Sequence, residues 1–204
     1  MTRLRSSVHA AATRLGRRLG ERPKRSASRD APSALVIPVP AGAQATAGWS
    51  GDARRLIAQG MPYHVTVLYP FVAADAIDDE VESALAVIAT GCAGFEFELT
   101  AVRRFPEVLF IAPEPAEPFV ALTHAVHERW PEHPPYRGEF EDVVPHLTIA
   151  SGPEPAGLAG AVEAKLPIPA AAVELWLLTE EPDRSWAVRN RFALGREASA
   201  EGFD

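Results

Sequence analysis

Two short segments of the chain share a pattern of residue types that suits proton transfer. Residues 61–67 read Met-Pro-Tyr-His-Val-Thr-Val, and residues 144–149 read Val-Pro-His-Leu-Thr-Ile. In both, a proline shortly precedes a histidine, which is followed by an aliphatic residue, a threonine and another aliphatic residue. An imidazole can take up or release a proton near neutral pH, and a threonine hydroxyl can donate to an anionic oxygen. The pattern therefore favours acid–base chemistry at a group on which negative charge develops.

Both segments are rich in β-branched and aliphatic residues, so each is predicted to be a strand. In a strand, residues i and i+2 project from one face, about 7 Å apart along the backbone, and their neighbours project from the other. His64 and Thr66 therefore share a face, with the aliphatic residues buried behind them. His146 and Thr148 share a face in the same way.

The repetition of the pattern is what makes it informative. The two histidines are 82 residues apart, and none of the other four is followed two residues later by a threonine: His9, His124, His127 and His133. The alternative is that His64 and His146 are ordinary core histidines and that each threonine is only a strand former. A second copy in another β-prone run disfavours this alternative.

The remaining elements alternate irregularly along the chain. Strands are predicted at 34–39, 64–69, 95–103, 108–112, 145–150, 173–179 and 185–194, and helices at 52–59, 78–90, 117–130 and 156–166. This order lacks regular βα repeats, which favours an α+β fold with antiparallel sheets. The glycine-rich turns of dinucleotide and nucleoside-triphosphate sites are absent, which argues against those functions.

Composition and charge divide the 204 residues into three parts. Residues 1–33 hold nine basic and two acidic residues and are expected to form a disordered basic arm, or else an amphipathic helix. Residues 34–195 are expected to form the catalytic domain, and 196–204 a flexible tail. Beyond residue 33 there are 11 basic and 25 acidic residues, a charge of −14, which disfavours long duplex nucleic acid but allows a small phosphorylated ligand.

Several classes of protein are disfavoured. The single cysteine, Cys92, excludes an internal disulfide and a multi-cysteine metal site. No apolar run approaches the roughly 18 residues of a membrane span, and because residues 1–33 lack an apolar region we do not expect them to be a secretory signal. His124, His127 and Glu128 have helical spacing but lack a metal-binding motif. We expect a cytoplasmic monomer without a metal or cofactor.

The doubled motif resembles the 2H phosphoesterase superfamily, specifically its 2'-5' RNA ligase family. The resemblance runs from about residue 35 to 194 and is supported by the sequence around each motif and by residues 105–111. It implies a bilobal fold, with two pseudo-symmetric lobes and antiparallel sheets around a central cleft that both motifs face. It also implies metal-independent cleavage or formation of phosphodiesters at RNA ends. In this family the two histidines act as acid and base, and the two threonines hold the phosphate.

The predicted function is therefore phosphodiester chemistry on a 2',3'-cyclic phosphate or a related RNA 3'-end, with RNA 2'-5' ligation as the reverse reaction. Some members carry a basic residue shortly after the second motif, where this chain has Ala150, Ser151 and Gly152. The alternative is a catalytically idle RNA-binding adaptor that docks RNA through its basic arm. Six further residues are predicted to be possible substrate contacts: Tyr69, Phe71, Phe105, Tyr136, Arg104 and Arg137.

Overall fold

The computed structural model describes residues 31–49, 59–138 and 142–196. Nearly all of the predicted basic arm, the helix predicted at 52–59 and the tail after residue 196 lie outside the described residues. The fold below concerns the described part of the chain alone.

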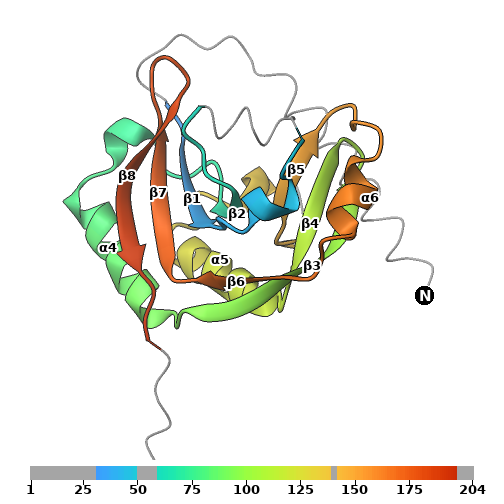
Figure 1. The fold of residues 1–204 in the computed structure, drawn as a ribbon. Coiled ribbons are helices and arrows are strands. Elements are labelled where there is room, and N and C mark those ends of the chain that lie inside the picture. The colour runs from blue at the N-terminus through green and yellow to red at the C-terminus, as the bar shows by residue number, and fades with distance from the viewer. Residues whose placement is uncertain (1–30, 50–58, 139–141, 197–204) are drawn as a thin grey trace, which may run out of the picture.

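Eight strands form one strongly curled sheet in the order β6-β3-β4-β5-β2-β1-β7-β8, and every neighbouring pair is antiparallel (Figure 1). Their bounds are β1 Ser33–Pro38, β2 His64–Leu68, β3 Phe95–Phe105, β4 Val108–Glu114, β5 Leu147–Ser151, β6 Ile168–Ala172, β7 Glu174–Glu180 and β8 Trp186–Ala193. The two motif strands, β2 and β5, are neighbours at the centre of the sheet, with three more strands on either side.

The helices lie against the sheet and each other. Their bounds are α2 Gly42–Ala45, α4 Asp79–Gly91, α5 Glu117–Arg129 and α6 Leu158–Glu163, with 3-10 turns η1 Ala74–Ala76 and η2 Pro135–Gly138. The helix α4 begins where the Asp78 carboxylate accepts a hydrogen bond from the backbone N–H of Val81, an N-cap. The helix α5 packs against β2, where the buried Thr123 hydroxyl donates to the carbonyl of Val67.

The alternation of side chains along the strands separates a large core from two smaller clusters. The large core lies between sheet and helices and includes Leu35, Ile37, Val65, Val67, Leu109, Ile111, Leu147 and Ile149, with Leu85, Phe119, Leu122 and Val126 from the helices. The opposite face holds one cluster on each side of the motif strands: Ala34, Val36, Met61, Leu178 and Trp186, and then Val108, Phe110 and Ala112. The central strands are therefore apolar on both faces, except where the motifs interrupt them.

The predicted α+β class with antiparallel pairing is confirmed. Two lobes around a cleft stay a prediction, because what the structure shows is one continuous sheet. The strand predicted from Pro145 begins at Leu147, the helix predicted at 156–166 is shorter, and β6 was missed. The segment of β6 carries alanines and a proline (Ile-Pro-Ala-Ala-Ala), a composition with low β-propensity, and it is extended because it pairs with β3.

One domain boundary needs correction. Ser33, which we placed in the arm, is the first residue of β1 and is fully buried, and its hydroxyl donates to the carbonyl of Val72. The carbonyls of Ala31 and Pro32 also accept backbone hydrogen bonds, from Ala74 and Glu180. The folded domain therefore starts no later than residue 31.

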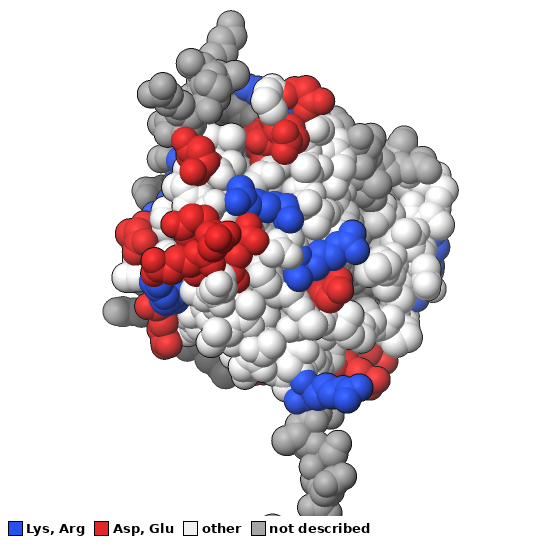
Figure 2. Space-filling view, turned by 90° about the vertical axis from the view of Figure 1, so that its left-hand side faces the viewer, with Lys and Arg blue, Asp and Glu red and all other residues white. Residues whose placement is uncertain are grey.

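The surface carries the acidic charge that the composition indicates. Figure 2 views the side of the molecule that carries α4 and β8, and acidic side chains gather over part of it. The first turn of α4 alone has Asp79, Glu80 and Glu82. Within the described residues, no helix is long and apolar enough to cross a membrane.

Candidate active site

The two motif strands meet at one residue pair. Val65 of β2 lies directly opposite Leu147 of β5, and the strands run antiparallel. Both side chains are fully buried in the large core. The residues on either side of each must project from the opposite face of the sheet. This places His64, Thr66, His146 and Thr148 together on that face.

The antiparallel direction decides which motif residues face each other. Counting outward from Val65 and Leu147, His64 lies on the side of Thr148, and Thr66 on the side of His146. The four side chains therefore alternate, imidazole and hydroxyl, around the central pair. Directly opposite residues in such a ladder have Cβ atoms about 4.5–5.5 Å apart, which is close enough for a hydroxyl and an imidazole to contact one small anion.

The same backbone interaction orients both rings. The Nδ1 of His64 donates to the carbonyl of Pro62, and the Nδ1 of His146 donates to the carbonyl of Val144, both at 2.7 Å. A carbonyl oxygen only accepts, so each Nδ1 carries the proton and Nε2 is the atom that exchanges protons. Neither Nε2 has a hydrogen-bond partner within the part of the chain that the structure describes.

The strands next to β2 and β5 are irregular at equivalent positions. The β1–β2 register shifts between Leu35 and Val36, next to the pairing of Val36 with Thr66. The β4–β5 register shifts between Leu109 and Phe110, next to the pairing of Phe110 with Thr148. Bulges at matching positions in both halves, together with the matching Nδ1 bonds, relate the two motifs by an approximate local twofold axis.

Burial lowers the pKa of both histidines. For His64 the largest cause is desolvation, the hydrogen bond to Pro62 opposes it, and the positive charge of a protonated His146 lowers the pKa further. For His146 desolvation again dominates, against the hydrogen bond to Val144. The electrostatic interaction between the rings means that protonating His146 disfavours protonating His64. Both imidazoles are therefore mainly neutral at pH 7 before an anion binds.

Aromatic side chains surround His146. Phe105 contacts the imidazole edge-on at 5.3 Å between ring centroids, and Phe110 at 5.4 Å. The two phenyl rings stack on each other at 4.4 Å. Tyr136 lies nearly parallel to the imidazole at 6.4 Å. These rings cover part of the half-buried imidazole of His146 and contribute to the desolvation that lowers its pKa.

The turn η2 brings Tyr136 to this site. Both Tyr136 and Arg137 have left-handed backbone conformations, with φ of 51° and 60°, which are uncommon for residues other than glycine. Such strained positions cluster at functional sites. Burial raises the pKa of the Tyr136 phenol to about 12, so this residue stays protonated and is not a base near neutral pH.

The motif threonines differ from three other threonines of the described chain, whose hydroxyls are bonded within the fold. Thr46, Thr100 and Thr123 each donate their hydroxyl to a backbone carbonyl. Thr66 and Thr148 are half-buried, and within residues 31–49, 59–138 and 142–196 their hydroxyls have no such bond. Both hydroxyls can therefore donate to a ligand at the site.

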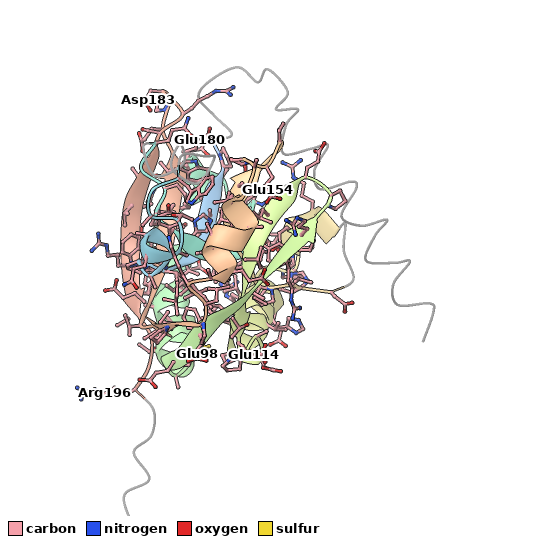
Figure 3. All side chains as sticks on the ribbon, turned by 45° about the vertical axis from the view of Figure 1, so that its right-hand side comes forward. Glu98, Glu114, Glu154, Glu180, Asp183 and Arg196 are labelled. Carbon is pink, nitrogen blue, oxygen red and sulfur yellow. The ribbon has the colours of Figure 1, made fainter. Side chains whose placement is uncertain are left out.

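Two of the six possible contacts predicted from the sequence lie away from the site. Phe71 is only 3% exposed and packs in the large core against Trp130, with ring centroids 5.0 Å apart, so it cannot stack on a substrate. Arg104 pairs in register with the core residue Leu109, so it projects from the helix face of the sheet, opposite to Thr148. Its guanidinium is bound to Glu154 at 3.0 Å, and Figure 3 labels this carboxylate.

The other four lie nearer the motifs or at their edge. Phe105 and Tyr136 contact His146, as described above. Tyr69 is half-buried and packs edge-on against Trp186, with ring centroids 6.1 Å apart, in the cluster on the motif face. Arg137 is exposed in η2, next to Tyr136.

Sequence reasoning missed two residues on the motif face. Phe110 pairs in register with Thr148 and contacts His146, and Arg103 pairs with Phe110 on the next strand. The predicted hairpin of 95–103 with 108–112 brings the two strands together, and the structure shows that its register pairs Arg103 with Phe110. Placing both residues on the motif face also required the register of β4 with β5, which the sequence does not contain.

The described residues offer little for metal or thiol chemistry. In the described ranges, no three His, Cys, Asp or Glu side chains gather in a way that could hold a metal ion. Burial raises the pKa of the Cys92 thiol, which makes it a weaker nucleophile at neutral pH.

Comparisons with known proteins concern the family and the fold of the chain. The model of the 2'-5' RNA ligase superfamily matches residues 42–184, more than half of the chain. Among solved structures, the chain resembles E. coli LigT in its apo form (TM-score 0.52, 16% identity, 83% of this chain and 100% of that chain). It also resembles LigT complexed with 3'-AMP (TM-score 0.50, 16% identity, 81% and 99%) and TT0787 of Thermus thermophilus (TM-score 0.49, 19% identity, 81% and 99%). No curated protein matches the chain.

Fold and family model together define a protein of the 2H phosphoesterase type, as the repeated motif predicted. The chain belongs to the 2'-5' RNA ligase superfamily. The likeness to the two E. coli LigT structures, at 16% identity, concerns the fold.

Proposed function

We propose that this protein is a metal-independent phosphodiesterase that opens 2',3'-cyclic phosphates or related phosphodiesters at RNA ends. The observation that carries the proposal is the pairing of Val65 with Leu147, which sets two imidazoles and two hydroxyls around one position on the sheet. Superfamily membership supports a phosphodiesterase or ligase type of enzyme. The complex of the similar E. coli LigT with 3'-AMP supports a small nucleotide as ligand.

The proposed reaction needs one proton acceptor and one proton donor. The Nε2 of one neutral histidine takes a proton from water, whose oxygen attacks the phosphorus of the cyclic phosphate. The bond from phosphorus to one ribose oxygen breaks, and the protonated second histidine gives its proton to that oxygen. The product is a nucleotide with a ribose hydroxyl and a phosphomonoester. With the 5'-hydroxyl of another RNA end in place of water, the same steps form a phosphodiester.

Binding of the substrate favours protonation of the histidine that acts as the acid. A phosphate anion beside the two Nε2 atoms stabilises imidazolium and raises the low pKa that desolvation imposes on each ring. Because the two rings repel each other when both are charged, the first proton that binds disfavours the second. One ring is therefore protonated while its partner stays neutral, although the two environments are similar. The hydroxyls of Thr66 and Thr148 donate to the non-bridging oxygens, where negative charge accumulates.

The test is an assay of 2',3'-cyclic nucleotides and cyclic-ended oligonucleotides with EDTA present. We expect hydrolysis by the wild-type chain and a loss of about 10²- to 10⁴-fold in rate for His64→Ala and for His146→Ala. His124→Gln, on the exposed side of α5, is the matched control and should keep full activity. Near-normal turnover by His64→Ala, or activity that EDTA abolishes, would overturn the proposal.

A further inference from the structure

Arg103 lies in line with the motif residues across the sheet. Thr148 of β5 pairs with Phe110 of β4, and Phe110 pairs with Arg103 of β3. Residues that pair in register project from the same face, so Arg103 shares the face of the two histidines and two threonines. Two strand spacings, about 10 Å, separate its backbone from that of Thr148, a gap that an extended arginine side chain is long enough to span in part.

Arg103 differs from the neighbouring Arg104 in the face from which it projects and in its ion pairing. Arg104 projects from the opposite face and is held by Glu154. Arg103 is exposed, and among the described residues it has no ion pair. Glu98 and Glu114, which pair across the β3–β4 ladder, lie at the other end of this hairpin from Glu154 (Figure 3). Within the described residues, the guanidinium of Arg103 is therefore a cation without an acidic partner on the motif face of an otherwise acidic domain.

A second arginine, Arg191, lies on the other half of the sheet, but its guanidinium already has a partner. Thr66 pairs with Val36, Val36 with Trp176, and Trp176 with Arg191, which places Arg191 three strand spacings from the motif. Its guanidinium lies over the Trp176 ring, 4.2 Å from the centroid. Such a cation–π contact holds the guanidinium in place. Arg103 is nearer to the motifs and is not engaged in this way.

We propose that Arg103 binds a second phosphate of the substrate, the 5'-phosphate of the nucleotide whose reacting phosphate lies between the motifs. This inference rests on the proposed function, and it adds to it a residue and a substrate preference. The reacting phosphate already has two imidazoles and two hydroxyls, and Phe110 stands between it and Arg103. A guanidinium can bind two oxygens of one phosphate in a bidentate way. The guanidinium of Arg103 therefore suits a second phosphate, separate from the one that the imidazoles and hydroxyls contact.

Binding tests the inference without requiring turnover. Isothermal titration calorimetry would compare adenosine 3'-monophosphate with adenosine 3',5'-bisphosphate, which differ by the second phosphate. We expect the wild-type chain to bind the bisphosphate at least about tenfold more tightly, and Arg103→Ala to lose this preference while its affinity for the monophosphate is unchanged. Arg104→Ala is the matched control and should keep the preference. Arg103→Lys should keep part of the preference for the bisphosphate, because a lysine retains the positive charge but cannot bind two phosphate oxygens in a bidentate way.

The outcomes separate this inference from the proposed function. Equal affinity of the wild-type chain for the two nucleotides, binding of neither, or a preference that survives Arg103→Ala would overturn the role of Arg103. If Arg191→Ala, and not Arg103→Ala, lost the preference for the bisphosphate, the second phosphate would bind on the other half of the sheet. That result would also overturn the role of Arg103. A preference that depends on Arg103, without turnover of any cyclic phosphate, would support this inference while the proposed function fails.

Discussion

Val65 and Leu147 lie directly opposite each other, and their pairing is the link between the two motifs. It is the one residue pair that joins β2 to β5 in the described sheet, and both side chains are fully buried. Every proposal about the site depends on it, because it fixes which residues share the opposite face.

Leu147→Ala tests that link. Removing most of a buried leucine side chain leaves a cavity, and we expect the free energy of unfolding to fall by about 2–5 kcal/mol in urea denaturation. Val173→Ala, at a position that is 62% exposed, is the control and should change stability by less than about 0.5 kcal/mol. If the Leu147→Ala protein were as stable as the Val173→Ala protein, the contact between β2 and β5 would not be packed as described.

Removing either motif hydroxyl should weaken stabilisation of the reacting phosphate. For Thr66→Val and for Thr148→Val we expect kcat/KM on a 2',3'-cyclic nucleotide to fall by about 10- to 100-fold, as for loss of a hydrogen bond to a charged group. The control is Thr100→Val, since the Thr100 hydroxyl is bonded to the carbonyl of Ala112 in the neighbouring strand. Equal effects of all three substitutions would indicate a structural role for the motif threonines.

The dependence of rate on pH follows from the lowered pKa values of His64 and His146. In the free enzyme the acid must be protonated, and its proton is lost as the pH rises through a pKa below the ordinary 6.5. We therefore expect kcat/KM to be greatest below pH 6.5 and to fall at higher pH. The profile of kcat should extend to higher pH, because the bound phosphate raises the pKa of the acid. A kcat/KM maximum above about pH 7.5 would contradict this reasoning.

The aromatic rings around His146 provide a test of why its pKa is low. Phe105→Ala lets water reach the imidazole, so the pKa of His146, measured by NMR of the ring protons, should rise toward 6.5. The pKa of His64 should change much less. Tyr69→Ala, which removes a ring packed on Trp186, serves as the control. If Phe105→Ala lowered the pKa of His146 or shifted both histidines equally, desolvation by this cluster would not be the cause.

Deleting residues 1–30 distinguishes the enzyme from the RNA-binding adaptor that the basic arm suggests. The deletion keeps Ser33 and the first strand intact. We expect turnover of a 2',3'-cyclic mononucleotide to stay within about twofold of the full chain, because a mononucleotide contacts the motif face alone. An adaptor would show no turnover in either form and would lose affinity for RNA on deletion, which a filter-binding assay would detect.

Much of the fold follows from local patterns. The alternation in β3, the stripe of Phe119, Leu122 and Val126 in α5 and the acidic first turn of α4 each predict an element that the structure contains. Local patterns failed for β6, whose proline and alanines have weak strand preference, and for α2 and η2, which are too short to show a period. These segments take their conformation from the elements they pack on.

The sequence by itself determined the chemical inventory: two histidines and two threonines, each pair on one face of a strand, because side chains alternate along any strand. Tertiary structure alone decided that β2 and β5 are neighbours, that Val65 faces Leu147, and that Phe110 and Arg103 join the motif face while Phe71 and Arg104 do not. The physical reason is that the side-chain period of a strand is a local property. Strand order and register depend on long-range hydrogen bonds and on the packing of the buried face, which no short window of residues encodes.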